Sequence, residues 1–200
     1  MEKVLLVIGD GGEVMDTMAP MYRLREDYDV VIAAPEQRRY HLVQHELESG
    51  WDITVERPAY HLNSQIAFGE IDPSEYIGLV LPGGRAPEYL RYDADLMRIT
   101  RWFFEHEKPV ASICHGIEIL AAADVIRGRK VTTIPKCRYD AEFSGGEYLE
   151  QSVVISGNLV CCQGKKDIAL WMKAFTGVLS AFLGNESSTA ACHAKLGGAD

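Results

Sequence analysis

Val110-Ala111-Ser112-Ile113-Cys114-His115-Gly116 carries an apolar, strand-length run directly into a cysteine at a glycine-marked turn. The residues that follow, 117–123, have the composition of a helix. A cysteine at such a corner lies at a helix N-terminus, where free N–H groups and the helix dipole favour the thiolate over the thiol. We therefore expect Cys114 to be a nucleophile whose pKa is lowered.

The same alternation of strand and helix extends outward from this turn. Further apolar runs at residues 4–8, 29–34 and 78–81 resemble buried strands, and helical spacing of apolar residues follows at 15–22 and 96–103. This order predicts a parallel sheet covered by helices on both faces, with ligands bound at the carboxyl ends of the strands. Those ends fall at Gly9–Glu13, at Gly83–Glu88, and at Cys114 with His115.

The remaining segments complete a single predicted domain over residues 1–183. Residues 36–70 are long and polar enough to predict a β-hairpin excursion, and a second hairpin is expected at 153–161. A final helix shows one apolar stripe over 168–179. After Gly184 the chain is rich in Ser, Ala and Gly, and we expect a flexible tail over 184–200.

Composition narrows the classes of partner and compartment. The 200 residues carry a net charge of −9, which disfavours binding to a phosphate backbone, so nucleic acid is not expected as a partner. A basic leader and an apolar run of about 18 residues are both lacking, which predicts a cytoplasmic protein without a membrane partner. The five cysteines form no C-x-x-C pair, so neither a disulfide framework nor a zinc site is expected.

Three strings in order resemble the ThiJ/PfpI family: Leu81-Pro82-Gly83-Gly84-Arg85-Ala86-Pro87-Glu88, Lys108 to Gly116, and Val125-Ile126-Arg127-Gly128-Arg129-Lys130. The resemblance runs from residue 3 to about 180 and is greatest to the branch of PfpI-like intracellular proteases and glyoxalase III enzymes. It implies an α/β, flavodoxin-like, class I glutamine-amidotransferase-like sandwich with a mainly parallel central sheet. It also implies a strained elbow at the cysteine and an acidic partner aligned with Glu13.

In that branch, the glutamate matching Glu88 reaches the histidine of a neighbouring subunit, which implies a homo-oligomer that completes the site. This chain departs from its relatives at Cys161-Cys162-Gln163, in place of a Thr-Ser-Arg type segment, and around Cys137. How the segment at 161–163 affects substrate binding stays open, and so does the role of Cys137. The thiols other than Cys114 are expected to be inert packing residues.

The residue chemistry leads to one preferred function and two alternatives. A protonated Glu13 would donate to the sulfur of Cys114, and the N–H groups of Gly83, Gly84 and His115 would bind a developing oxyanion. With Glu13 or His115 moving a proton, such a site converts methylglyoxal or a related 2-oxoaldehyde to a 2-hydroxy acid without metal, glutathione or other cofactor. The alternatives are a PfpI-like peptidase or amidohydrolase, and a non-catalytic redox-stress sensor or chaperone.

Overall fold

A seven-stranded sheet forms the centre of the computed structural model, which describes residues 1–196, with side chains to residue 185. Every neighbouring pair in this sheet is parallel except β10 and β11. The predicted mainly parallel sheet is therefore confirmed. In spatial order the strands are β10 (Val153–Ser156), β11 (Leu159–Cys162), β7 (Val110–Ile113), β6 (Tyr76–Leu81), β1 (Lys3–Val7), β2 (Asp29–Ala34) and β5 (Ile66–Ala67).

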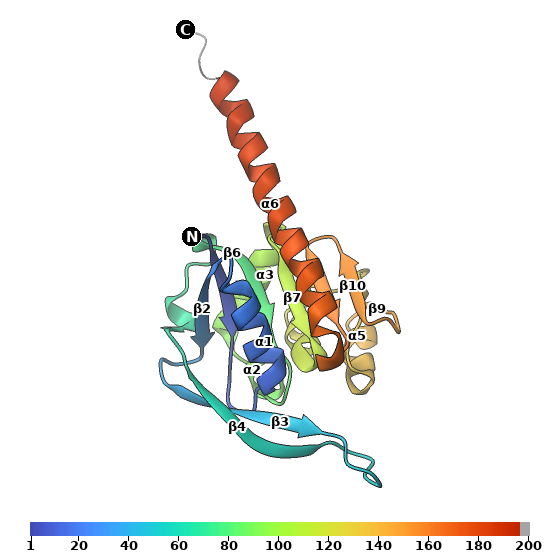
Figure 1. Ribbon diagram of the computed structural model, residues 1–200. Helices are drawn as coiled ribbons and strands as arrows, with labels where there is room; N and C mark the ends of the chain where they lie inside the picture. The colour runs from blue at the N-terminus through green and yellow to red at the C-terminus, as the bar shows by residue number, and fades with distance from the viewer. Residues whose placement is uncertain (197–200) are drawn as a thin grey trace.

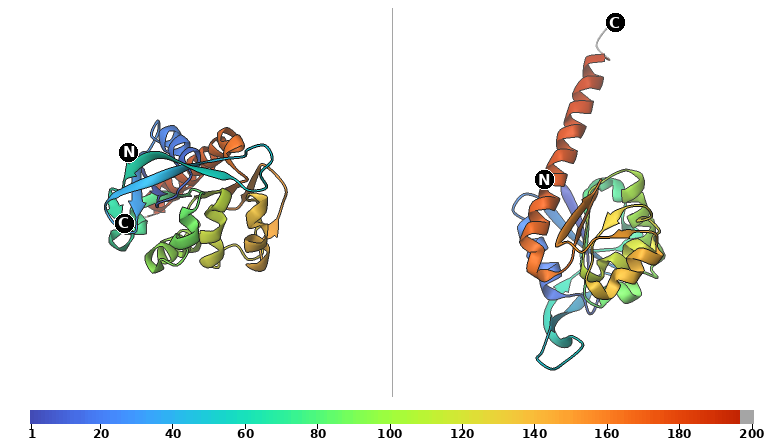
Figure 2. Two further views of the ribbon diagram at one scale, coloured as in Figure 1. Left: turned by 90° about the horizontal axis from the view of Figure 1, so that it is seen from below. Right: turned by 90° about the vertical axis from the view of Figure 1, so that its right-hand side faces the viewer.

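Helices cover both faces of the sheet, as Figure 2 shows, and alternate residues of the strands pack against them. In β1, Leu5 belongs to one apolar cluster and Leu6 to the other, so each face of the strand is buried. This gives the three-layer α/β sandwich that was predicted. One face carries α1 (Val14–Leu24) and α6 (Ile168–Leu196), and the other carries α2 (Ala86–Leu90), α3 (Ala94–Glu105), α4 (Ile117–Ala122) and α5 (Arg138–Phe143).

Short elements fill the connections. A parallel pair is formed by two-residue strands, and single 3₁₀ turns precede several longer elements. Their bounds are β8 (Lys130–Val131), β9 (Glu147–Tyr148), η1 (Phe68–Glu70), η2 (Pro73–Glu75), η3 (Cys114–Gly116), η4 (Pro135–Cys137) and η5 (Lys165–Asp167).

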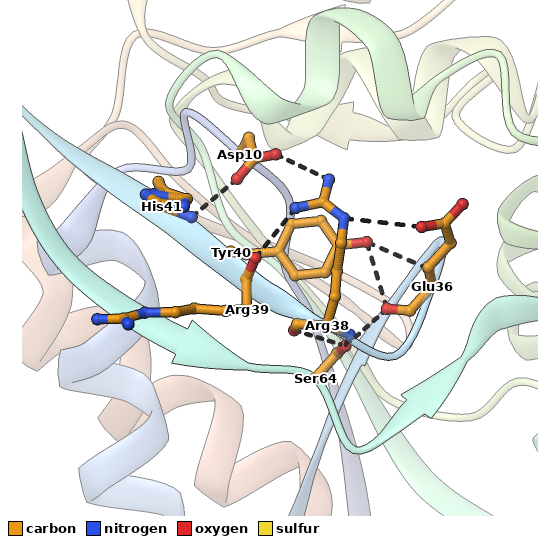
Figure 3. Close-up of polar contacts among 7 residues, drawn as sticks. All are labelled: Asp10, Glu36, Arg38, Arg39, Tyr40, His41 and Ser64. Carbon is orange, nitrogen blue, oxygen red and sulfur yellow. Dashed lines mark hydrogen bonds and ion pairs between the residues drawn. The ribbon is translucent and has the colours of Figure 1, made fainter.

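The predicted excursion is a separate antiparallel hairpin of β3 (Arg39–Glu46) and β4 (Val55–Asn63), which crosses the end of the sheet in Figure 1. Asp10, just beyond β1, fixes its base. The Asp10 carboxylate accepts hydrogen bonds of 2.8 Å from the backbone N–H of His41 and from the Arg38 guanidinium (Figure 3). These bonds hold the hairpin over the carboxyl ends of the strands, where the predicted ligand site lies.

The C-terminal helix corrects one prediction. α6 continues to Leu196 and runs out of the body of the molecule in Figure 1, so residues 184–196 are helical where a flexible tail was expected. No proline interrupts this stretch, and its alanines sustain a helix already nucleated on the sheet. Residues 197–200, the end of the predicted tail, lie outside the described residues.

The first part of α6 is a core helix. By length and composition alone, Lys165–Asn185 is apolar enough to cross a membrane. Its apolar stripe, however, is buried against the sheet through Trp171, Phe175 and Leu179. The Trp171 indole also donates to the backbone oxygen of Val160 in β11, at 3.0 Å. Packing within the domain thus buries one stripe of this segment, while Leu170 on another face is exposed.

Candidate active site

Cys114 lies on a sharp turn directly after β7. Its φ is 55°, a left-handed conformation that costs free energy for a residue with a Cβ. The hydroxyl of Thr133 holds the turn by donating a 2.6 Å hydrogen bond to the backbone oxygen of Cys114. Gly116 lets the turn close, because a Cβ there would lie 2.3 Å from the backbone oxygen of Leu81. The elbow predicted from the sequence is present.

The carboxyl group that meets the Cys114 side chain belongs to Asp16. A Cβ built on Gly83 would lie 2.6 Å from the Cβ of Cys114 and 2.7 Å from Oδ2 of Asp16, so the two side chains converge over this glycine. Asp16 is buried, and the sequence analysis missed it. Its signal was its spacing, because Asp16 lies three residues after Glu13 on the first turn of α1 and so shares a helix face with it.

Glu13 lies at the N-terminus of α1. It caps α1, and its Oε2 accepts a 2.8 Å hydrogen bond from the backbone N–H of Asp16. Its Oε1 is buried and lies 3.7 Å from Nζ of Lys165. Glu13 lines the same cavity as Cys114, but its carboxylate is engaged by a helix N-terminus and a lysine. The predicted donation from Glu13 to the sulfur stays a prediction, and Asp16 is a second carboxyl group close to the thiol.

Burial sets the protonation of the central groups. Burial, with a smaller contribution from Asp16, raises the pKa of the Cys114 thiol well above its ordinary value, although the N–H groups of His115 and Gly84 lower it by hydrogen bonding to the sulfur. The prediction of a lowered pKa is wrong for this chain because desolvation outweighs these donors. Burial and the Glu13 charge likewise raise the pKa of Asp16, which favours its protonated form.

His115 completes a pair with the thiol. Its Nδ1 lies 3.3 Å from Sγ of Cys114. Burial lowers the pKa of His115, which keeps the imidazole neutral near neutral pH and able to accept a proton. Cys114 and His115 therefore have the arrangement of a nucleophile beside a general base.

The two glycines predicted as oxyanion donors both face the site. The N–H of Gly84 donates toward the Cys114 sulfur, and the N–H of Gly83 donates toward the Asp16 carboxyl group. Gly84 has φ of 84°, and a Cβ there would lie 2.2 Å from the backbone nitrogen of Glu13. Both positions require glycine, and their N–H groups organise the thiol and its carboxyl partner in the free protein.

A cavity of about 460 Å³ opens onto Cys114 and His115. The hairpin covers one side of it, and the cavity is of the size that encloses a small molecule. Glu88 also lines this cavity within the same chain, where its carboxylate pairs with the Arg85 guanidinium at 3.2 Å. The hairpin residues that line the cavity are His45, Leu47, Ile53 and Thr54.

The unusual segment after β11 brings a cation to this cavity. Cys161 and Cys162 are buried in β11, and the chain then turns so that Gly164 and Lys165 line the cavity. The Lys165 ammonium donates to the backbone oxygen of His45 in the hairpin as well as facing Glu13. Lys165, which follows the unusual segment 161–163, thus lines the cavity. The sequence analysis did not assign it to the site.

Together, the fold and this turn define a class: α/β sandwich proteins with a cysteine on a strained elbow at the carboxyl end of a central parallel strand. Residues 2–177 match the family model described as the DJ-1/PfpI family. The chain belongs to the DJ-1/PfpI family.

Relatives and solved structures agree with this membership. The chain is 38% identical over 177 residues to "Deglycase TK1284" of Thermococcus kodakarensis, covering 88% of this chain and 99% of the relative. It is 30% identical over 142 residues to "Putative cysteine protease YraA" of Bacillus subtilis, covering 71% and 83% of the two chains. A ThiJ/PfpI domain protein from Brachyspira murdochii shares the fold, with a TM-score of 0.76, 19% identity, and coverage of 90% and 96%.

Proposed function

We propose that this protein is a cysteine-dependent enzyme that converts methylglyoxal or a related 2-oxoaldehyde to a 2-hydroxy acid. The observation that carries the proposal is the Cys114–His115 pair, 3.3 Å apart, at the base of a cavity of about 460 Å³. A cavity of this size suits a small electrophile. The chemistry below draws only on side chains of this chain.

The first step is addition of the thiol across the aldehyde. His115 takes the proton of Cys114 as the sulfur bonds to C1, and that proton is then delivered to the carbonyl oxygen, giving a hemithioacetal. Because burial raises the pKa of Cys114, the proton leaves during attack rather than beforehand. A neutral His115 is the form that this step requires.

The second step moves hydrogen within the bound substrate. Removal of the C1 proton gives an enediol, and protonation at C2 gives the thioester of a 2-hydroxy acid. Water then cleaves the carbon–sulfur bond, releasing the acid and returning the proton to the thiol. His115 is the base nearest the sulfur, and a protonated Asp16 can donate to an oxygen of the intermediate.

The relatives that are named deglycases support an extension of the substrate class. An early adduct of a 2-oxoaldehyde on an amine carries nitrogen and hydroxyl on C1. If Cys114 displaces the amine, the carbon–nitrogen bond breaks, the amine leaves with the thiol proton, and the same hemithioacetal forms. We therefore include early adducts on amino groups among the proposed substrates, in accord with a relative 38% identical to this chain.

A cysteine peptidase is the second candidate, and the name of the Bacillus subtilis relative favours it. The cavity of about 460 Å³, lined on one side by Leu47 and Ile53 of the hairpin, suits a small molecule better than an extended polypeptide. A redox-stress sensor uses the same thiol, but it leaves the His115 contact without a role.

We also propose that the protein acts in the cytoplasm as a homo-oligomer in which Glu88 faces a second subunit. Its side chain is half-exposed, which leaves it accessible to such a contact. Mixing inactive Cys114→Ala and Glu88→Ala chains tests this. Activity recovered on mixing supports a shared site, whereas no recovery in a mixed oligomer places Glu88 in its own chain's cavity.

A substrate panel tests the proposed function. Wild type and Cys114→Ala are assayed without glutathione on methylglyoxal, on its early adduct with N-acetyllysine, and on denatured casein, with lactate, released amine and peptides as readouts. We expect lactate from the first two substrates with wild type alone. Cleavage of casein without lactate formation would replace the proposal with the peptidase.

A further inference from the structure

Three side chains with metal-ligating atoms converge, and one of them, His115, also belongs to the Cys114–His115 pair. His115 lies on η3, Glu118 on α4 and Cys137 at the end of η4, and one ligating atom from each lies within 4.8 Å of the other two. We propose that these residues bind a thiophilic divalent cation of the zinc type, and that binding switches off the enzyme. The binding site stands on its own geometry, whereas the switch rests on the proposed function.

The spacing of the three groups fits a tetrahedral cation. His115 and Glu118 are three residues apart on consecutive helical turns, so their side chains share one face. Sγ of Cys137 lies 3.8 Å from Oε1 of Glu118. Two ligands bonded to zinc at ordinary lengths are separated by about 3.5 Å, so only a small adjustment is needed.

Glu118 is the second observation that points to a ligand. Its side chain is more than nine-tenths buried, and among the described residues its Oε2 has no hydrogen-bond donor. The nearest cation is the Arg91 guanidinium, at 3.5 Å. Arg91 also lies 3.4 Å from Asp140, so it keeps an anionic partner when Glu118 turns toward a metal. Oε1 of Glu118 faces Sγ of Cys137 and is the oxygen offered to a metal, while Oε2 keeps the Arg91 ion pair.

The donor set selects the class of cation. Thiolate, imidazole and carboxylate are together the ligands of zinc and of cobalt in its place, and they disfavour magnesium and calcium. Binding releases the thiol proton of Cys137 to solvent, and one thiolate and one carboxylate then balance the charge of the dication. The fourth position is left for water, because His115 also lines the cavity.

A metal ion bound by His115, Glu118 and Cys137 removes the general base of the proposed reaction. A nitrogen lone pair of His115 committed to the metal cannot accept the Cys114 proton, and the cation lies next to the thiol that would attack the substrate. The site thus gives this chain a reversible response to free zinc.

Cobalt binding to the metal-free full-length protein tests the site without reference to turnover. A thiolate ligand gives Co²⁺ a near-ultraviolet charge-transfer band. We expect one equivalent of Co²⁺ with this band in wild type and in Cys114→Ala. We expect its loss in Cys137→Ala, and its retention in Cys161→Ala, which removes a buried thiol that is not a member of this cluster. Zn²⁺ should displace the cobalt.

One further variant guards against misfolding, and an inhibition assay links the site to activity. Glu118→Gln keeps the shape of the side chain and should weaken Co²⁺ binding by more than about tenfold. Zn²⁺ should inhibit wild type but spare Cys137→Ala, whose activity without metal stays near that of wild type. A band that survives in Cys137→Ala and vanishes in Cys114→Ala, or binding of Co²⁺ without any thiolate band, would overturn the proposal.

Discussion

Asp16 and Cys114 approach each other over the bare Cα of Gly83, where an added Cβ would come within 2.7 Å of the carboxyl oxygen of one and 2.6 Å of the Cβ of the other. The buried acid and the partly buried thiol thus form a pair whose negative charges repel each other. Burial and the neighbouring charge raise both pKa values, which disfavours the doubly ionised state.

Asp16→Asn should lower the pKa of Cys114, because the ionised form of Asp16 raises this pKa and Asn cannot ionise. The rate of alkylation by iodoacetamide, followed from pH 7 upward, should begin to rise at lower pH than in wild type. Glu13→Gln is the matched control and should move this onset less. An onset that moves in Glu13→Gln and stays fixed in Asp16→Asn would show that Glu13, and not Asp16, is the carboxyl group that raises the pKa of Cys114.

Gly83→Ala should disrupt the site, because the new methyl group overlaps both side chains of the pair. We expect a loss of more than about tenfold in kcat/KM and of about 1–3 kcal/mol in the free energy of unfolding. Gly177→Ala in α6 serves as the control. Its Cβ would meet no described atom within 4 Å, so helix propensity should stabilise that variant by about 0.5–1 kcal/mol. Denaturant unfolding separates the two outcomes.

Thr133→Val should loosen the elbow. The substitution keeps the shape of a fully buried side chain but removes the donor to the backbone oxygen of Cys114. Leaving that oxygen without this donor should cost about 1–3 kcal/mol of stability. We expect kcat to fall while KM changes little, because the thiol is displaced and the cavity walls are not. An unchanged kcat would show that the backbone conformation at Cys114 does not depend on Thr133.

Lys165→Met should free the hairpin, because the ammonium group links the backbone of His45 to Glu13. Limited proteolysis should then cut within residues 47–54 faster than in wild type, and KM should rise. Lys166→Met, a change of the same kind one residue later, should leave both measurements near wild type. Equal proteolysis of all three proteins would contradict the link.

The sheet and the elbow could be predicted from the sequence because both depend on local patterns of residues. Runs such as residues 4–8 are buried on two faces and are apolar throughout, and a glycine after Cys114 marks a turn in any context. The protonation of the site was not predictable in the same way. The pKa of Cys114 is set by desolvation, which depends on what the fold packs around the sulfur.

Asp16 and Lys165 were missed for a related reason. Both are charged residues on or near helix ends, where charge ordinarily faces solvent, and only the packing of α1 and η5 against the elbow brings them to the cavity. The length of α6 was missed because a run of Ser, Ala and Gly has the composition of a tail, although its alanines also continue a helix.

Formation of lactate from methylglyoxal in the absence of glutathione, compared between wild type and Cys114→Ala of equal stability, tests the central claim most directly. Catalysis by the Cys114–His115 pair predicts steady lactate release by wild type and none above background by the variant. Equal lactate release by the two proteins would contradict it.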